Sequence, residues 1–297
     1  MTASPATKIQ PLDADISAPT PKRRVRFRAM GLAGAGAIIL LMLIVVGIAA
    51  PWIAPYDPRA VLLLDRLKPP LTSGHLLGTD ALGQDVFTRV IYGARISLLV
   101  GFIGVAISGT LGMTLGLLAG YYGGLLDDVI MRIADIQLAF PTIILYVAVM
   151  AVRGPGLANL IVVIGVVGWV QYGRVERGMV LAERQREYVQ AARVLGVPDR
   201  VILLRHILPN TLGPMMVVAS FGLANIIILE ASLSFLGLGV PPSVPSWGSM
   251  LADGRDYLRT SWWLATFPGI AITLTVLAIN LLGDWLRDRF DPLLRTR

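Results

Sequence analysis

Six long apolar stretches constrain the fold of this chain more than any other feature of its sequence. The first covers residues 31–51, and about 20 apolar residues in a helix cross the roughly 30 Å hydrocarbon layer of a bilayer. Since 55% of all residues are hydrophobic and only 15% are charged, the composition also indicates a lipid environment. We therefore expect an all-α integral membrane protein with six transmembrane helices. The other five expected spans are residues 95–120, 129–151, 157–177, 212–236 and 263–283.

The arginines predict how these spans are oriented, because basic residues accumulate on the cytoplasmic side of a membrane. A basic cluster at residues 22–28 precedes the first span, and the end of the fourth span together with the segment that follows it carries seven arginines against four acids. We therefore expect this segment and both termini in the cytoplasm. The turn near Asp127 and Asp128 fits less well, since it holds two acids and only Arg132 nearby. Acidic residues contribute little to this rule.

The predicted division of the chain follows from these spans. Prolines between residues 51 and 70 exclude long helices, so the segment after the first span is expected to be an extracytoplasmic loop. A cleaved secretory signal is the alternative for the first span, but the apolar run is too long for one. The expected parts are a disordered, basic N-terminal tail at 1–30, the first span at 31–51, the loop at 52–94, a five-helix core at 95–285 with a cytoplasmic elbow at 183–209, and a cytoplasmic C-terminal tail at 286–297.

The sequence contains none of the common catalytic patterns. It has no cysteine, no HExxH and no GxSxG. None of its three lysines follows a glycine, so it has no phosphate-binding GxxxxGK[ST] loop. If the protein works with ATP, another chain must hydrolyse it. His75, Asp80 and Asp85 suit loop structure better than a metal site, because the only other histidine is His206. The scattered arginines also argue against nucleic-acid binding.

Glycines and polar residues within the spans point to packing and to a transport path. Gly112, Gly116 and Gly120 recur every four residues, which predicts a helix face that a neighbouring helix approaches closely. Asn225 and Glu230 lie in the fifth span, where buried polar groups are costly and mark substrate pathways or structural contacts. We consider both as pathway candidates, and for Glu230 a structural helix cap remains equally open. Other polar residues in the apolar segments are Asp135, Gln137, Gln171, Asn280 and Asp284.

The segment at 183–209 is expected to form two short amphipathic helices joined at a glycine. The first run, from about residue 183 to 195, places Tyr188, Ala191, Ala192 and Leu195 on one face. Gly196 occupies a helix C-cap position that allows a positive φ. Pro198 and Asp199 suit the start of the second run, which is apolar enough to lie against the membrane helices and is expected to stop at Pro209. The small alanines would let another protein approach this elbow.

The elbow resembles the coupling loop of ABC importer permeases. In that family an Ala-Ala pair, a glycine four residues later and a Leu-Pro pair twelve residues after the glycine recur. These correspond here to Ala191 and Ala192, to Gly196, and to Leu208 and Pro209. The chain departs from the pattern at Gln190, where glutamate is usual, and at His206, where an aliphatic residue is usual. Further segments that are similar to the C-type permeases of the dipeptide/oligopeptide branch are APYDP, HLLGTDALGQDVFTRVIYGARISLLVG, ASLSFLGLGVPPSVPSWGSML and GDWLRDRFDPLL.

The resemblance implies a type I importer permease fold in the bacterial inner membrane, with Glu187 and Gln190 joining the family-pattern residues of the elbow as ATPase-coupling residues. It implies four partners: a B-type permease, two cytoplasmic ATP-binding subunits that hold ATP and magnesium, and an extracytoplasmic solute-binding protein. It also implies a peptide cargo, although relatives carry nickel, glutathione or opines. An ion-coupled carrier is disfavoured because no internal repeat is evident. A membrane enzyme is disfavoured by the missing motifs.

Overall fold

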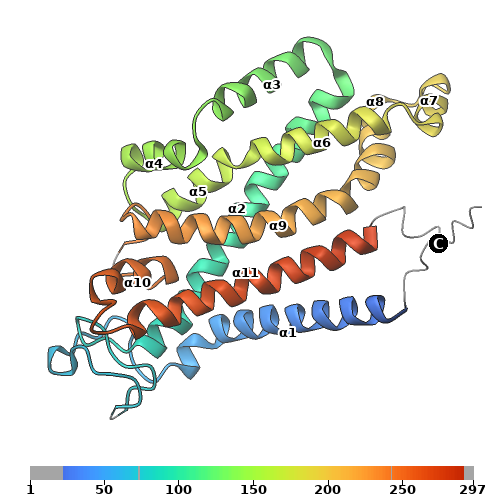
Figure 1. The fold of residues 1–297 in the computed structure, drawn as a ribbon. Helices are drawn as coiled ribbons and strands as arrows, with labels where there is room; N and C mark the ends of the chain where they lie inside the picture. The colour runs from blue at the N-terminus through green and yellow to red at the C-terminus, as the bar shows by residue number, and fades with distance from the viewer. Residues whose placement is uncertain (1–22, 73, 242, 291–297) are drawn as a thin grey trace, which may run out of the picture.

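The protein is a bundle of long helices. The computed structural model describes residues 23–72, 74–241 and 243–290, and this part of the chain contains no named strand. Helices α1, α9 and α11 run side by side, and α2 crosses behind them (Figure 1). The elements are α1 Arg23–Ile53, η1 Leu63–Asp65, α2 Val86–Tyr122, α3 Gly124–Leu138, α4 Thr142–Arg153, α5 Leu157–Val167, α6 Trp169–Glu183, α7 Glu187–Val194, α8 Asp199–Val201, η2 Ile202–Ile207, α9 Leu208–Phe235, α10 Trp247–Gly254, η3 Arg255–Tyr257 and α11 Trp263–Phe290.

Within the described residues, five helical segments are long and apolar enough to cross a membrane. Four of them are longer than a single span requires, and α2 and the unit from α8 to α9 each extend over 37 residues. The bent pair α3–α4 makes a sixth span if its two helices are counted together. The five segments and this pair agree with the predicted all-α membrane fold. The five segments are Gly31–Ile53, Val86–Tyr122, Leu157–Glu183, Asp199–Phe235 and Trp263–Phe290.

The third span differs from the uninterrupted stretch predicted at 129–151. Here α3 and α4 meet at an angle of 89° across a break of a few residues. Pro141 directly precedes α4. A proline supplies no backbone N–H and disfavours helical geometry in the residue before it, so the helix ends near Phe140 and a new one begins. The bend places α3 along the outer side of α6 (Figure 1).

Several predicted boundaries were also wrong. The loop predicted at 52–94 ends earlier, because α2 begins at Val86, where the carboxylate of Asp85 caps the helix by accepting from the N–H of Thr88 at 2.8 Å. Helix α1 begins at Arg23 and α11 continues to Phe290, so both enter segments predicted as tails. Helices need not end where apolar sequence ends. Residues 1–22 and 291–297, most of the two predicted tails, lie outside the described residues.

The glycine face of α2 packs against α6, as predicted. A Cβ added at Gly112 would lie 2.6 Å from the Tyr172 Cβ, and one added at Gly116 would lie 2.8 Å from the Glu176 Cβ. Side chains at these positions would force the helices apart. The two backbones therefore approach closely over more than two helical turns, which makes α2 and α6 a stiff pair.

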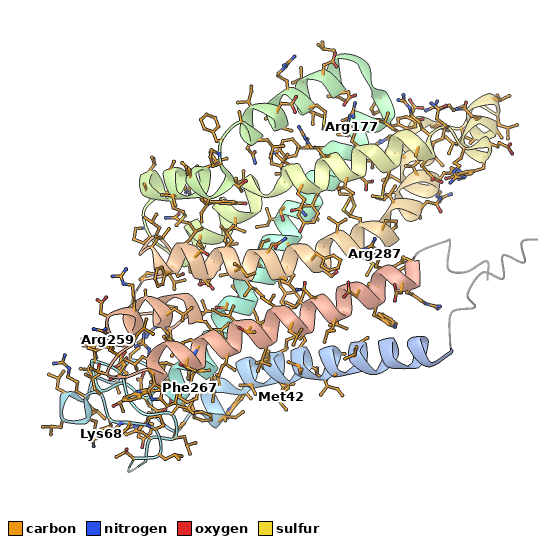
Figure 2. The ribbon with its side chains drawn as sticks, viewed as in Figure 1. Met42, Lys68, Arg177, Arg259, Phe267 and Arg287 are labelled. Carbon is orange, nitrogen blue, oxygen red and sulfur yellow. The ribbon has the colours of Figure 1, made fainter. Side chains whose placement is uncertain are left out.

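Ionisable side chains gather at the two ends of the bundle. Figure 2 shows Lys68 and Arg259 at one end and Arg177 and Arg287 at the other. The acidic turn at 127–128 has a cationic partner that is distant in sequence. The guanidinium of Arg177 on α6 donates to both carboxylate oxygens of Asp127, at 2.5 and 2.6 Å. The positive partner of this turn thus comes from another helix and not from its own neighbours in sequence.

The predicted loop residues at the other end hold the loop onto α2. The Nδ1 atom of buried His75 lies 2.9 Å from an oxygen of Asp85, the residue that caps α2. Asp80 accepts from the backbone N–H groups of Leu82 and Gln84, at 2.8 Å each, and pairs with Arg89. These three predicted residues therefore lie in a folded loop in which their side chains contact protein groups.

Candidate functional site: an elbow between α6 and α9

The segment that joins α6 to α9 forms a compact elbow at the end of the bundle where α1 begins and α11 ends (Figure 1). After α7, Gly196 adopts a φ of +72°, which confirms the predicted helix-ending glycine. The N–H of Gly196 donates to the carbonyl of Arg193, and the N–H of Val197 donates to that of Ala192, each at 3.0 Å. This pair of bonds is the Schellman motif, and it reverses the chain sharply after two helical turns.

The underside of the elbow is packed into the bundle. Val189, Ala192, Ile202 and Ile207 are buried and form one apolar cluster with α2 and α6 residues, among them Val180. The prediction that the second run lies against the membrane helices is thereby confirmed. Of the two alanines expected to leave room for another protein, Ala191 is exposed as expected, whereas Ala192 is buried. A two-turn helix buries the side that meets α2 and α6, and Val189 lies on that side.

The second run was predicted to stop at Pro209, but it continues into α9. A π-helical turn over Ile202–Ile207 leads directly into α9, and Pro209 sits in the first turn of that helix. A proline in a first turn sacrifices no intrahelical hydrogen bond, and the wider π turn before it accommodates the ring. The elbow is therefore continuous with a 28-residue helix, with no loop between them.

A cluster of three polar side chains closes the elbow on its own base. The hydroxyl of Tyr188 on α7 donates to the carboxylate of Glu183 at the end of α6 and accepts from the side-chain amide of Asn210 at 3.0 Å. The same amide lies 2.6 Å from the carbonyl oxygen of His206. Burial and then the neighbouring Glu183 raise the pKa of Tyr188 to about 12. We call Glu183, Tyr188 and Asn210 the elbow clasp.

Arginine and tyrosine side chains also fasten the elbow to the end of α2. The hydroxyl of Tyr121 donates to Asp199 at 2.6 Å, and the guanidinium of Arg193 lies 4.9 Å from the centre of the Tyr121 ring. Arg184 donates to the carbonyl oxygen of Gly120 at 3.0 Å, where a cation is favoured by the dipole of the helix end. These contacts join the elbow to α2, as the apolar cluster joins it to α6.

The outer tip of the elbow is exposed and mixed in character. Val194 and Leu195 are 88% and 81% exposed, and Ala191, Glu187 and Gln190 are exposed on the same short helix. The amide of Gln190 donates to the carbonyl of Arg184 at 3.0 Å. Two large apolar residues this exposed, on a rigid base and ringed by charges, are typical of a surface that binds another protein. The predicted coupling residues are thus brought together, except that Ala192 and Leu208 point inward.

The two pathway candidates have different environments. Asn225 is exposed on α9, and its side chain has no hydrogen-bond partner among the described residues. Glu230 has no exposed surface, and its two oxygens accept from Ser97 on α2 and Ser234 on α9, at 2.9 Å each. Glu230 therefore lines no open path along this chain in this structure, and it bridges α2 and α9 near their end opposite the elbow.

Sequence reasoning missed the residues that hold the elbow in place. Arg184 and Asn210 lie in or beside the predicted segment and Tyr121 lies at the end of α2, but their partners are distant in sequence or come from the backbone. A polar aromatic residue at the end of an apolar helix was the only local signal.

Two family models match the chain. Residues 112–296 match the binding-protein-dependent transport system inner membrane component, and residues 22–70 match the N-terminal transmembrane domain of oligopeptide transport permease C. The chain is 44% identical over 265 residues to a di/tripeptide transport system permease protein of Pseudomonas aeruginosa, covering 88% of each chain. It is 43% identical over 288 residues to a glutathione transport system permease protein of Pectobacterium atrosepticum, covering 96% of each.

A solved structure shares the fold. An inward-facing structure of the MetNI methionine ABC transporter superposes with a TM-score of 0.54 at 19% sequence identity, covering 68% of this chain and 96% of the other. At that identity the likeness concerns the arrangement of helices alone.

Proposed function

The chain belongs to the family of binding-protein-dependent transport system inner membrane components, and on that premise we propose that it is one of two membrane subunits of an ATP-driven importer of short peptides. The similarity to a di/tripeptide permease supports this cargo. The relative named for glutathione fits the same class, because glutathione is itself a tripeptide.

The elbow is the part on which a cytoplasmic ATPase subunit acts in this proposal. The observation that carries it is the contrast between the exposed tip at Val194 and Leu195 and the base clamped to α2, α6 and α9. A force applied at such a tip moves several helices together as a rigid body, which is the kind of motion alternating access requires. The family-pattern residues Ala191, Ala192 and Gly196 form the turn that sets the shape of the tip.

The proposed assembly has four partners and a defined orientation. It comprises a B-type permease, two ATP-binding subunits that hydrolyse ATP, and an extracytoplasmic solute-binding protein, placed in the bacterial inner membrane. The start of α1 and the end of α11 lie at the elbow end of the bundle (Figure 1). This arrangement favours a common cytoplasmic location for both termini and the elbow. The excess of arginine in the elbow segment supports the same side.

Asn225 is our candidate for the path between the two permeases. An exposed amide in the middle of a span is unfavourable against lipid and needs a polar neighbour. Its position on α9, the helix that continues from the elbow, supports this choice, because a movement of the elbow would also move α9.

Replacing Ala191 by glutamate tests the docking role. Because Ala191 is exposed, the variant should fold and insert, but the added charge and bulk should prevent the ATPase from seating, so peptide uptake should fall to background. Ala191→Ser, which adds one small group, is the matched control and should transport normally. Uptake and ATPase association that remain normal in Ala191→Glu, at equal amounts of inserted protein, would reject the docking role.

A further inference from the structure

A cavity of about 560 Å³ lies at the end of the bundle opposite the elbow. It lies between the loop before α2, through residues 58–61 and 80–86, and the short helices α10 and η3, and it is open to solvent on one side. Binding sites for small organic molecules occupy roughly 300–1,000 Å³. This cavity has no part in the transport function proposed above. The volume of the cavity suits a small ligand and is too small for a folded protein segment.

One wall of the cavity carries an excess of negative charge. Arg89, which is almost fully buried, pairs with the carboxylate of Asp80 and donates to Asp253 at 3.2 Å. Asp256, one helical turn after Asp253, also lines the cavity. Three carboxylates therefore line the cavity beside one buried guanidinium, which pairs with two of them. Asp256 contacts Arg255 at 3.2 Å instead, and Arg255 does not line the cavity.

Two groups in this wall are available to a ligand. Asp80 is occupied by two backbone N–H groups and Arg89, but Asp253 uses only one carboxylate oxygen, and about half of its side chain is exposed. Gln84 is only 9% exposed and lines the cavity, and its side-chain amide has no hydrogen-bond partner among the described residues. The amide can therefore form hydrogen bonds with a polar ligand atom in the cavity.

The remaining lining is mostly apolar, with two hydroxyl residues, Ser243 and Tyr257, and one cation on the loop side. Val61, Met250 and Leu264 offer apolar contact, and the exposed guanidinium of Arg59 has no ion pair among the described residues. A matching ligand has a protonated amine for Asp253 and Asp256, an amide for Gln84, a short apolar body and an anionic end for Arg59. A metal ion would leave the amide and the apolar walls unused.

We propose that this cavity binds a short peptide through its α-ammonium group. The assignment rests on the proposed function for its cargo class, and it adds a binding site on the permease itself. Burial raises the pKa of Asp253, while Arg89 opposes that shift. The cationic end of a peptide would supply the counter-charge that this carboxylate has only in part.

The test measures binding without transport. The permease pair with its ATPase subunits, in lipid nanodiscs and without the solute-binding protein, is equilibrated with radiolabelled alanyl-phenylalanine. We expect saturable binding, a loss of about tenfold or more for the N-acetylated dipeptide, and losses of similar size in Asp253→Asn and Asp256→Asn. Ala252→Trp, which fills the cavity from its own lining, should abolish binding. Asp128→Asn, an exposed aspartate outside the cavity, is the matched control.

Each alternative outcome is decisive. Absence of saturable binding, equal binding of the acetylated dipeptide, or unchanged binding in Asp256→Asn and Ala252→Trp overturns the proposal. A further outcome is that the wild type binds no peptide and that these variants weaken docking of the solute-binding protein. This outcome would mean that the cavity receives a basic side chain of that protein, and it would also overturn the proposal. Uptake of peptide by the complete system is measured separately. The cavity can therefore bind an amine although peptide is not transported, and peptide can be transported although the cavity binds no amine.

Discussion

The substitution Gly196→Val isolates the bend of the elbow from every other contact. Gly196 has a φ of +72°, and its N–H and that of Val197 form the two hydrogen bonds of the turn. A Cβ added at this position would meet nothing within 4 Å. The cost of the substitution therefore lies in the backbone and not in a clash.

The size of the effect follows from that backbone conformation. A residue with a side chain loses about 1–2 kcal/mol in the left-handed region, and β-branched residues stand at the upper end. A loss of about 2 kcal/mol lowers the ratio of bent to unbent elbow by about 30-fold. If only the bent form docks, the apparent Kd for the ATPase subunits rises by up to the same factor.

The assay is binding of labelled ATPase subunits to the permease pair in nanodiscs, followed by peptide uptake. Gly196→Asn should bind nearly as well as wild type, because asparagine tolerates this conformation. Gly34→Val is the matched control, since Gly34 also has open space around it but lies within a helix. Wild-type affinity in Gly196→Val would refute the reasoning, because the bend would then not limit docking.

Three further substitutions test the packing around the elbow and the bundle. Tyr188→Phe removes the central hydroxyl of the elbow clasp and should cost about 1–3 kcal/mol, seen as faster proteolysis of the turn after α6; unchanged cleavage would mean that the clasp is dispensable. Gly112→Ala should lower the thermal stability in detergent, since its Cβ overlaps α6, whereas Gly109→Ala, with 3.8 Å of room, should not; equal stabilities would contradict the packing. Glu230→Leu leaves two buried hydroxyls without an acceptor and should destabilise by about 1–3 kcal/mol, while Glu230→Gln should be tolerated. A changed transport rate in Glu230→Gln at wild-type stability would instead place this residue on the path.

The sequence predicted those features that depend on local chemistry. The helix-ending role of Gly196 follows from the conformational freedom of glycine, and the close approach of α6 follows from the spacing of Gly112 and Gly116. Each is a property of a few neighbouring residues that does not depend on the rest of the fold. Pro141 is an equally local signal for the break between α3 and α4, which hydropathy alone does not reveal because the stretch is apolar on both sides.

Features that depend on distant partners could not be predicted. Pro209 predicts the end of a helix in isolation, yet a π turn before it lets the chain continue into α9. The beginning of α2 at Val86 brings a charged residue, Arg89, into a buried helix, which is stable only because Asp80 and Asp253 meet it. The buried face of α7 was likewise set by where α2 and α6 lie, and not by the pattern of its own apolar residues.

The central claim is that the tip of the elbow faces the cytoplasm and is covered there by an ATPase subunit. The chain has no cysteine, so a single Val194→Cys variant provides a clean probe at a residue that is 88% exposed. The measurement is labelling by a membrane-impermeant maleimide in inside-out and right-side-out vesicles, with and without the ATPase subunits. The account predicts labelling only in inside-out vesicles and protection when the ATPase is present. Labelling in right-side-out vesicles, or equal labelling with and without the ATPase, would contradict it.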